Sequence, residues 1–152
     1  MVETYIKVKG QWVYLYRAVD KFGKTLNFTL SERRNKPTAI KFFARAVEVN
    51  GLPRKIVIDK SAANTEGIKD INRMLKRFGC PVPMEIVRIK YLNNLVEQDH
   101  RSIKRQVRPM LGFKSFKSAA STIAGIELVN MIRKGQSRPE LRPFPQFCEL
   151  AA

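Results

Sequence analysis

The stretch that decides the fold runs from Glu3 to Leu30 and reads ETYIKVKGQWVYLYRAVDKFGKTLNFTL. Apolar and polar residues alternate through most of it, and the alternation is interrupted at Gly10 and again over residues 20–23. Period-two alternation that is broken at hairpin spacing is typical of antiparallel strands. The sequence therefore predicts strands over residues 4–8, 12–19 and 25–30, joined in order by hairpins.

Beyond Leu30 the periodicity becomes helical. Apolar residues at helical spacing predict helices over residues 37–50, 64–78, 94–108 and 118–134. Short β-branched or alternating runs predict strands over residues 55–58 and 85–91. Three antiparallel strands followed by alternating strands and helices predict an α/β fold, with a mixed sheet and helices on both faces. This is a ribonuclease H-like order, although other α/β folds share it.

The charge balance is strongly basic. The chain has 152 residues, and 29 Lys and Arg outnumber 13 Asp and Glu, which gives a net charge of +16. Such a field attracts polyanions and repels copies of the same chain. Membrane surfaces and acidic proteins are alternative partners, but no segment forms a basic amphipathic anchor. Nucleic acid is favoured because the basic residues recur along the whole predicted fold.

Several absences suggest a soluble, reduced, intracellular protein. The first residues do not resemble a signal peptide, and no apolar run approaches the roughly 20 residues that span a bilayer. Cys80 and Cys148 are far apart, and with His100 as the single histidine a structural zinc site has too few ligands. We expect a cytoplasmic protein.

Two carboxylates are candidates for chemistry. Asp59 directly follows the β-branched run 56–58, so it is expected at the carboxyl edge of the sheet, where α/β sites usually lie. A turn or cap aspartate is the alternative. Glu97 lies on the predicted helix 94–108, beside a stripe of cations that suits a phosphate backbone. Its alternative role is an i,i+4 ion pair with Arg101 on a solvated helix face.

For the other candidate residues, the sequence favours structural roles. His100 shares the apolar face of its helix, which favours a packed ring over a metal ligand. The strand spacing of Trp12, Tyr14 and Tyr16 favours sheet packing over a base-stacking platform. The segment Gly112–Lys117 reads as a helix-linking turn, with contact to DNA as the alternative.

Several segments together resemble one family. They are ETYIKV (3–8), YLYRAVD (14–20), IDKS (58–61), AN (63–64), KYLNN (90–94), EQDHR (97–101), LGFKSF (111–116), GIEL (125–128) and IRKGQ (132–136). This combination resembles the DDE transposases of short bacterial insertion sequences, the integrase-like group that includes insertion-sequence-six elements. The likeness runs from Glu3 to Gln136. It divides the chain into an expected catalytic core over residues 1–136 and a tail over residues 137–152.

The resemblance implies a ribonuclease H-like core that cleaves and joins DNA strands with a triad of Asp, Asp and Glu. Asp59 matches the second carboxylate and Glu97 the third, and both would ligate Mg²⁺ or Mn²⁺ in a two-metal site. Val2 stands where the family has its first Asp, and valine supplies no oxygen ligand. Rescue by Glu3 is not expected, because alternation turns it to the opposite strand face, nor is rescue by Asp20. Weak metal binding and greatly reduced activity are therefore expected.

The resemblance also implies contacts with DNA. The expected DNA-binding residues are Lys60, Asn64, Tyr91, Asn93, Asn94, Arg101, Lys104, Arg105 and Arg108. The expected partners are the ends of the mobile element, the target DNA and further copies of the chain, with a dimer as the plausible assembly. Family members carry an upstream helix-turn-helix region, so we expect a chain truncated at its N-terminus.

Two other functions stay open from the sequence. One is a non-catalytic, basic DNA-binding fragment that inhibits intact transposase. The other is a basic nucleic-acid-binding protein that has no transposase ancestry.

Overall fold

The computed structural model describes residues 1–58, 61–79, 84–88, 94–136, 144–145 and 148. Its first three strands form an antiparallel sheet in the order β1 (Val2–Val8), β2 (Gln11–Val19) and β3 (Thr25–Ser31). Tyr5 pairs with Tyr14 across β1 and β2. The turn between them, Lys9–Gly10, has positive φ at both residues, as a type I′ hairpin turn requires. The three predicted hairpin strands are confirmed.

Two shorter strands form a parallel pair. These are β4 (Lys55–Val57) and β5 (Glu85–Val87), in which Ile56 lies opposite Ile86. The amino group of Met1 donates a hydrogen bond of 2.6 Å to the carbonyl of Val57, so the start of β1 meets the end of β4. The mixed sheet predicted from the sequence is thus present as two ladders that meet at this bond. Of the strand predicted over residues 85–91, residues 89–91 lie outside the described part of the chain.

Four α-helices follow the predicted order. They are α1 (Lys36–Asn50), α2 (Ala62–Arg77), α3 (Asn94–Val107) and α4 (Phe116–Arg133), with a 3₁₀ turn η2 (Arg108–Met110) after α3. Side chains at the first residue outside three of these helices accept backbone N–H groups, as N-caps do. Asn35 caps α1, Ser61 caps α2 and Ser115 caps α4. The described residues contain no helix with the length and apolar character needed to cross a membrane.

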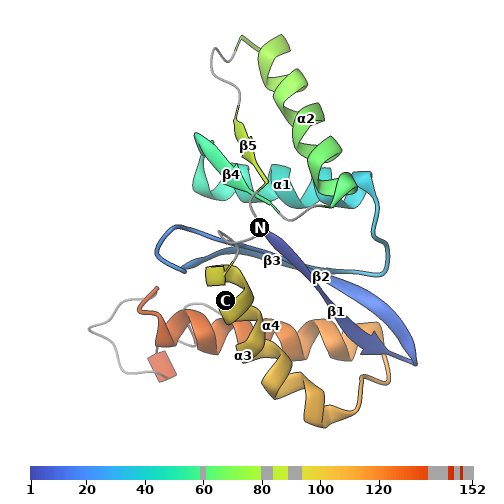
Figure 1. Ribbon diagram of the computed structural model, residues 1–152. Coiled ribbons are helices and arrows are strands. Elements are labelled where there is room, and N and C mark those ends of the chain that lie inside the picture. Colours follow the sequence, from blue (N-terminus) through green and yellow to red (C-terminus); the bar gives the residue numbers. More distant parts are fainter. Residues whose placement is uncertain (59–60, 80–83, 89–93, 137–143, 146–147, 149–152) are drawn as a thin grey trace.

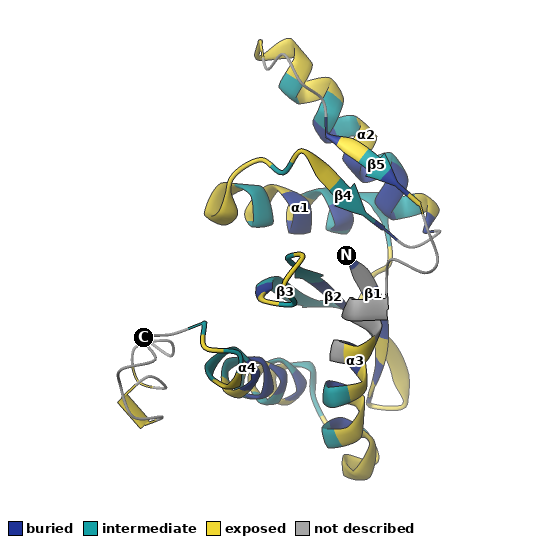
Figure 2. Cartoon of the chain, turned by 60° about the vertical axis from the view of Figure 1, so that its left-hand side comes forward, coloured by how far each residue is buried: buried dark blue, intermediate teal, exposed yellow. Residues whose placement is uncertain are grey.

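The helices form two layers around the antiparallel sheet (Figures 1 and 2). One apolar cluster joins β1 and β2 to α3 and α4, with Leu15 and Ile123 at its centre. The other joins the opposite sheet face to α1, α2, β4 and β5, with Tyr16 and Phe42 at its centre. Adjacent residues of β2 therefore belong to different clusters, as period-two alternation requires. Both faces are covered, as predicted.

Two large apolar residues that follow α2 and α3 are exposed. Phe78 is 83% exposed, and Met110 is 46% exposed. Phe78 comes directly after the last turn of α2, and Met110 lies in the 3₁₀ turn, where the helical phase has changed. The helix predicted over residues 64–78 thus ends one residue earlier than expected, and no described element covers either side chain.

Charged side chains link the layers. Arg17 on β2 and Glu127 on α4 form an ion pair in which both side chains are fully buried, and Arg17 Nη2 donates to Glu127 Oε2 at 2.8 Å. On the other side of the sheet, Lys36 of α1 pairs with Asp70 of α2. The hydrogen bond from Lys36 lowers the pKa of Asp70 below its ordinary value. Buried charges are tolerated only when they are paired, so Arg17 and Glu127 depend on each other.

Gln136 ties the end of the α4 segment to β3. Its side-chain amide accepts from the backbone N–H of Thr25 at 2.7 Å and donates to the backbone carbonyl of the same residue at 2.9 Å. The amide thus satisfies both main-chain groups at the start of the strand.

We expect Glu127→Ala to destabilise the protein by roughly 3–5 kcal/mol, because it removes the carboxylate from the buried Arg17. The double variant Arg17→Met with Glu127→Leu should recover most of this loss, because apolar side chains of similar volume avoid the cost of desolvating charges. Urea unfolding of the three proteins gives both values.

Lys69→Ala is the control, because its ion pair with Glu66 is exposed to solvent and should contribute little to stability. A Glu127→Ala loss no larger than that of Lys69→Ala would show that the buried pair does not stabilise the fold.

Candidate functional site

The fold brings the start of β1 to the carboxyl end of β4. Besides the bond from Met1 to Val57, the backbone N–H of Ile58 donates to the carbonyl of Val87 at 3.0 Å, and Ile58 is buried. The chain therefore leaves the parallel ladder at Ile58, immediately before Asp59. Asp59 and Lys60 themselves lie outside the described residues. The backbone on either side is consistent with the expected edge position, and the position of Asp59 stays a prediction.

Val2 opens β1, and its Cα partner across the ladder is Arg17. The position expected to correspond to the first family carboxylate is thus paired with the strand position that carries the buried arginine. Glu97 lies in the first turn of α3, and this helix contacts both β1 and β2. Figure 1 shows the start of α3 close to the start of β1. The side chains of Val2 and Glu97 are not among those described, so the expected pairing of Glu97 with Asp59 or with Arg101 is untested.

Glu3 faces α1 and α2, away from the α3 and α4 layer. Its Oε2 accepts from Arg34 Nε at 2.6 Å, and its Oε1 accepts from Ser61 Oγ at 3.3 Å. The carboxylate is nearly buried. Its charge is therefore compensated by Arg34. Alternation predicts that Glu3 lies on the strand face opposite to position 2. The contacts place Glu3 on the face covered by α1 and α2, and the side chain of Val2 is not among those described, so the opposition stays a prediction.

Asp20 has a turn role. Its Oδ1 accepts from the backbone N–H groups of Phe22 and Lys24, at 2.8 Å each, and so closes the hairpin between β2 and β3. An aspartate whose side chain bonds its own backbone two residues on is a typical turn former. No contact described for Asp20 connects it with the start of β1.

The first turn of α2 is buried beside Glu3. Ser61 Oγ lies 3.5 Å from the backbone N–H of Asn64, and Thr65 Oγ1 donates to the carbonyl of Ser61 at 3.0 Å. Asn64, expected at a DNA-binding position, is fully buried. Ser61 as a cap was not predicted, since the helix was expected to begin at residue 64. A serine three residues before Asn64 was the available signal. Arg34 carried no sequence signal.

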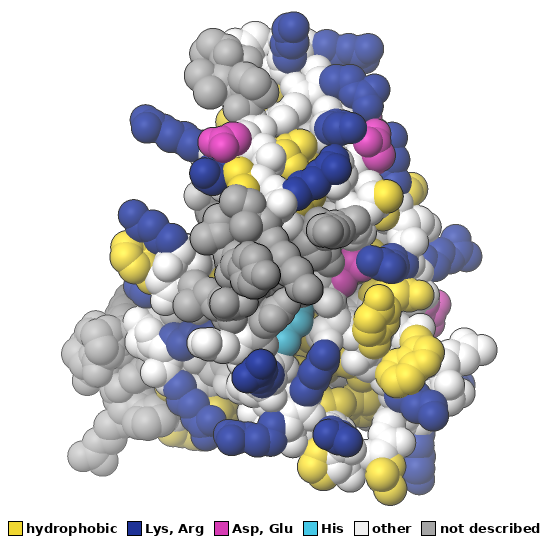
Figure 3. All heavy atoms as spheres, in the orientation of Figure 1, with side chains coloured by type: hydrophobic (Ala, Val, Ile, Leu, Met, Phe, Trp, Pro, Cys, Tyr) yellow, Lys and Arg dark blue, Asp and Glu magenta, His cyan; other side chains and the backbone are white. Residues whose placement is uncertain are grey.

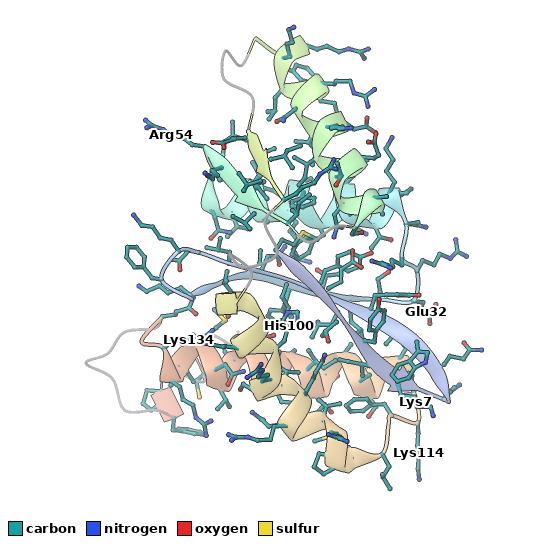
Figure 4. The ribbon with its side chains drawn as sticks, viewed as in Figure 1. Lys7, Glu32, Arg54, His100, Lys114 and Lys134 are labelled. Carbon is teal, nitrogen blue, oxygen red and sulfur yellow. The ribbon has the colours of Figure 1, made fainter. Side chains whose placement is uncertain are left out.

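His100 is buried on α3, as predicted, with 4% of its surface exposed (Figure 4). Among the side chains that the structure describes, no three His, Cys, Asp or Glu residues gather closely enough to hold a metal ion. The expected metal ligands Asp59 and Glu97 are outside that set. Tyr91 and Asn93 lie outside the described residues, and the side chain of Asn94 is not described either.

The four cations expected at the DNA interface are exposed. They are Arg101, Lys104, Arg105 and Arg108. All belong to α3 and η2, and in the view of Figure 3 Lys and Arg side chains spread over this part of the surface. Exposed cations along one helix can track phosphates without reading sequence. Their exposure permits contact with DNA, and their use in DNA binding stays a prediction.

Residues 112–115 link η2 to α4, as expected of a helix-linking turn, but Phe116 and Lys117 already belong to α4, whose start was predicted at residue 118. Phe113 is buried and pairs with the end of β1, because its N–H donates to Lys7 O at 2.9 Å and its carbonyl accepts from Lys9 N at 2.7 Å. Gly112 has φ of 102°, and a Cβ there would lie 3.2 Å from Lys7 O. Lys114 is exposed next to this junction.

The aromatic residues of β2 divide between two environments. Tyr16 is fully buried and lies against Phe42, so the prediction of sheet packing is confirmed for it. Trp12 and Tyr14 pack edge-on against Tyr5 of the neighbouring strand, as sheet packing predicts, but Trp12 is 61% exposed. Its ring lies near the hairpin tip, beyond the part of the sheet that the α1 and α2 layer covers.

Comparison with known proteins identifies the family. A family model described as a DDE domain matches residues 1–136. The chain belongs to the DDE transposase family. The Staphylococcus aureus transposase for insertion sequence-like element IS431mec is 37% identical over 137 residues, which is 90% of this chain and 58% of the relative. The S. aureus transposase for element IS257 in transposon Tn4003 matches with the same identity and coverage. This DDE transposase chain thus spans less than two thirds of these relatives.

Solved structures support the fold. The HTLV-2 integrase catalytic core domain in complex with magnesium, in its trimeric form, superposes with a TM-score of 0.53 at 16% identity, covering 97% of this chain and 77% of that one. The dimeric form of the same core gives a TM-score of 0.52 at 16% identity with the same coverage. The α/β, ribonuclease H-like fold expected for a DDE transposase is confirmed.

We expect Ser61→Ala to cost about 1 kcal/mol of unfolding free energy, because it removes the N-cap of α2. Ser115→Ala is the matched control, since it removes the N-cap of α4, far from Glu3, and should cost a similar amount. A double-mutant cycle with Glu3→Gln separates the two roles of Ser61. It should give a coupling of about 0.5 kcal/mol or more for Ser61 and none for Ser115. Equal couplings for the two serines would contradict the contact between Ser61 and Glu3.

Proposed function

We propose that this chain is the catalytic core of an insertion-sequence transposase that cleaves and joins DNA strands, and that Val2 impairs it. The observation that carries the proposal is the DDE-domain match over residues 1–136. Within this core we assign Asp59 to the second carboxylate position, Glu97 to the third and Val2 to the first. Because the chain covers 58% of its transposase relatives, the activity of those longer proteins is proposed here for their shared core.

The backbone geometry supports the site. The start of β1, the end of β4 and the start of α3 carry the three family positions, and these segments are far apart in the sequence. The bond from Met1 to Val57 joins the first two, and α3 contacts β1. A polynucleotidyl transferase needs its carboxylates gathered from separate elements in this way.

The residues present do not fit the two-metal site of the family. Mg²⁺ takes oxygen ligands, and the related integrase core was solved in complex with magnesium. Valine at position 2 supplies no oxygen. Glu3 is bonded to Arg34 and Ser61, and Asp20 closes a turn, so neither acid replaces the missing carboxylate. We therefore assign to this chain weak divalent-metal binding.

Calorimetric titration of Mn²⁺ tests the site with three proteins: the unaltered chain, Val2→Asp, and Val2→Asp with Asp59→Ala. Only Val2→Asp should bind well, because it alone restores the family set of carboxylates. Equal binding by all three, or by none, would remove position 2 and Asp59 from the metal centre. Metal-dependent joining of DNA by the unaltered chain, lost on Asp59→Ala, would contradict the proposed impairment.

The exposed cations of α3 and η2 are proposed to hold the DNA backbone. Lys60, Tyr91, Asn93 and Asn94 flank the two acids along the sequence and are proposed to position phosphates nearby. Asn64 is buried in the first turn of α2, so we propose that it orients the segment bearing Asp59 and does not contact DNA.

A second candidate function is supported by two observations. Valine stands at the proposed first acid position, and the cations of α3 and η2 are exposed. A chain that keeps the fold and the cations but lacks a metal ligand would bind DNA, or pair with intact transposase, and inhibit it. Adding the unaltered chain to a transposition assay with an intact relative distinguishes this function. Inhibition at DNA concentrations that exclude simple competition indicates pairing between subunits.

Single changes of Arg101, Lys104, Arg105 or Arg108 to alanine should weaken DNA binding about equally for any sequence. Each should also reduce the slope of log affinity against log salt by about one, because one counterion fewer is released. Fluorescence anisotropy over a range of salt concentrations measures the slope. Lys69→Ala on α2 is the control and should leave it unchanged. A sequence-dependent loss would indicate contacts with bases in place of phosphates.

A further inference from the structure

The sheet face that carries Glu3, Tyr5 and Tyr16 is covered over only part of its length. At the Tyr16 end, α1 and α2 pack on it, with the rings of Tyr16 and Phe42 5.8 Å apart. Toward the tip of the hairpin between β1 and β2 the cover ends, and Tyr5 and Trp12 are 48% and 61% exposed. An aromatic patch is left at the surface (Figure 3).

The rings of this patch hold one another in place. Tyr5 lies edge-on to Trp12 at a centroid distance of 6.4 Å and edge-on to Tyr14 at 5.5 Å. The three side chains line a shallow hollow of about 280 Å³. Edge-to-face packing is the preferred geometry of aromatic pairs, so the patch is preorganised and not a set of independent side chains. Exposed apolar clusters rimmed by polar residues are typical of interaction sites.

The surroundings of the aromatic patch are mainly cationic. Lys7 Nζ lies 5.9 Å from the centroid of the Trp12 ring. Lys9 and Lys114 are exposed at the same end of β1 as Lys7. The backbone of Phe113, the neighbour of Lys114, bonds to both Lys7 and Lys9. Figure 4 shows Lys7 and Lys114 at this end of the molecule, with the acidic Glu32 also near the sheet edge.

We propose that the patch of Tyr5, Trp12 and Tyr14 is a stacking site for unpaired DNA bases, with Lys7, Lys9 and Lys114 holding the adjoining phosphates. This inference rests on the proposed action on DNA. Aromatic faces bind any base, and neighbouring cations bind the backbone, which is the usual chemistry of single-strand recognition. The site takes a frayed or single-stranded segment, because paired bases inside a duplex do not present their faces.

A second copy of the chain fits the patch less well. Tyr5 and Trp12 are about half exposed and Tyr14 is partly buried, so the three rings offer a few hundred Å² at most. A stable interface buries roughly 800 Å² on each partner. The net charge of +16 also opposes self-association.

Trp12 is the single tryptophan of the chain, so its fluorescence reports on the patch alone. The unaltered chain is titrated with a thymine oligonucleotide and with a duplex of equal length, and binding is followed in parallel by the anisotropy of labelled DNA. We expect the single strand to quench Trp12 emission in step with binding, and the duplex to bind with little quenching.

Trp12→Ala should weaken single-strand binding roughly 5- to 150-fold, the range for losing one stacked base, and should change duplex affinity less than twofold. Tyr5→Ala keeps the fluorescent reporter and should reduce both single-strand affinity and quenching. Phe22→Ala is the matched control: Phe22 is 74% exposed and has Lys21 Nζ 4.9 Å from its ring, but it lies in the other hairpin. It should bind like the unaltered chain.

Three other outcomes would overturn the stacking site, and they differ in what they imply for the proposed function. DNA binding without quenching, and without loss on Trp12→Ala, overturns the stacking site but leaves the proposed function standing. Failure of the unaltered chain to bind either form of DNA overturns both proposals. Self-association in sedimentation that Trp12→Ala abolishes, with no quenching by DNA, assigns the patch to contact between copies and overturns the inference.

Discussion

The alternation of β2 is the constraint on which the rest of the structure depends. As the central strand of the antiparallel sheet, it sends Val13, Leu15 and Arg17 to one face and Tyr14 and Tyr16 to the other. Both sets are large and mostly buried, so each face needs its own cover. Helices α3 and α4 supply one cover and α1 and α2 the other, which produces the layered architecture of the family. A slip of one residue in register would exchange the two faces and bury the wrong side chains.

The same alternation organises the charges. Arg17 of β2 is charged and points toward α3 and α4, where Glu127 forms an ion pair with it. On the opposite face Glu3 is balanced by Arg34, and between α1 and α2 Asp70 is balanced by Lys36. Acids near the interior are thus held in ion pairs, and much of the surplus of cations lies at the surface. A chain with this distribution keeps a stable core and still presents a field that attracts DNA.

The candidate site lies where the ends of three elements meet: the end of one strand and the starts of a strand and a helix. The carboxyl end of β4, the start of β1 and the start of α3 come from distant parts of the sequence, and the backbone joins the first two directly. The basic helix α3 continues from this point, and the aromatic patch lies farther along β1 and β2. Phosphate contacts and base stacking would then occupy different surfaces of one small domain, which suits a DNA substrate that is partly unpaired near the reacting bond.

The sequence by itself determined the strands, the helices and the family, because these depend on local periodicity and on motifs that stand in the chain. It indicated Asp59, Glu97 and the valine at position 2, and it placed His100 in the core. Tertiary structure decided what depends on distant neighbours: Phe78 is exposed because no described element covers the end of α2, and Trp12 because the helical cover ends before the hairpin tip. The partners of Glu3 lie 31 and 58 residues away, so no local pattern could have named them.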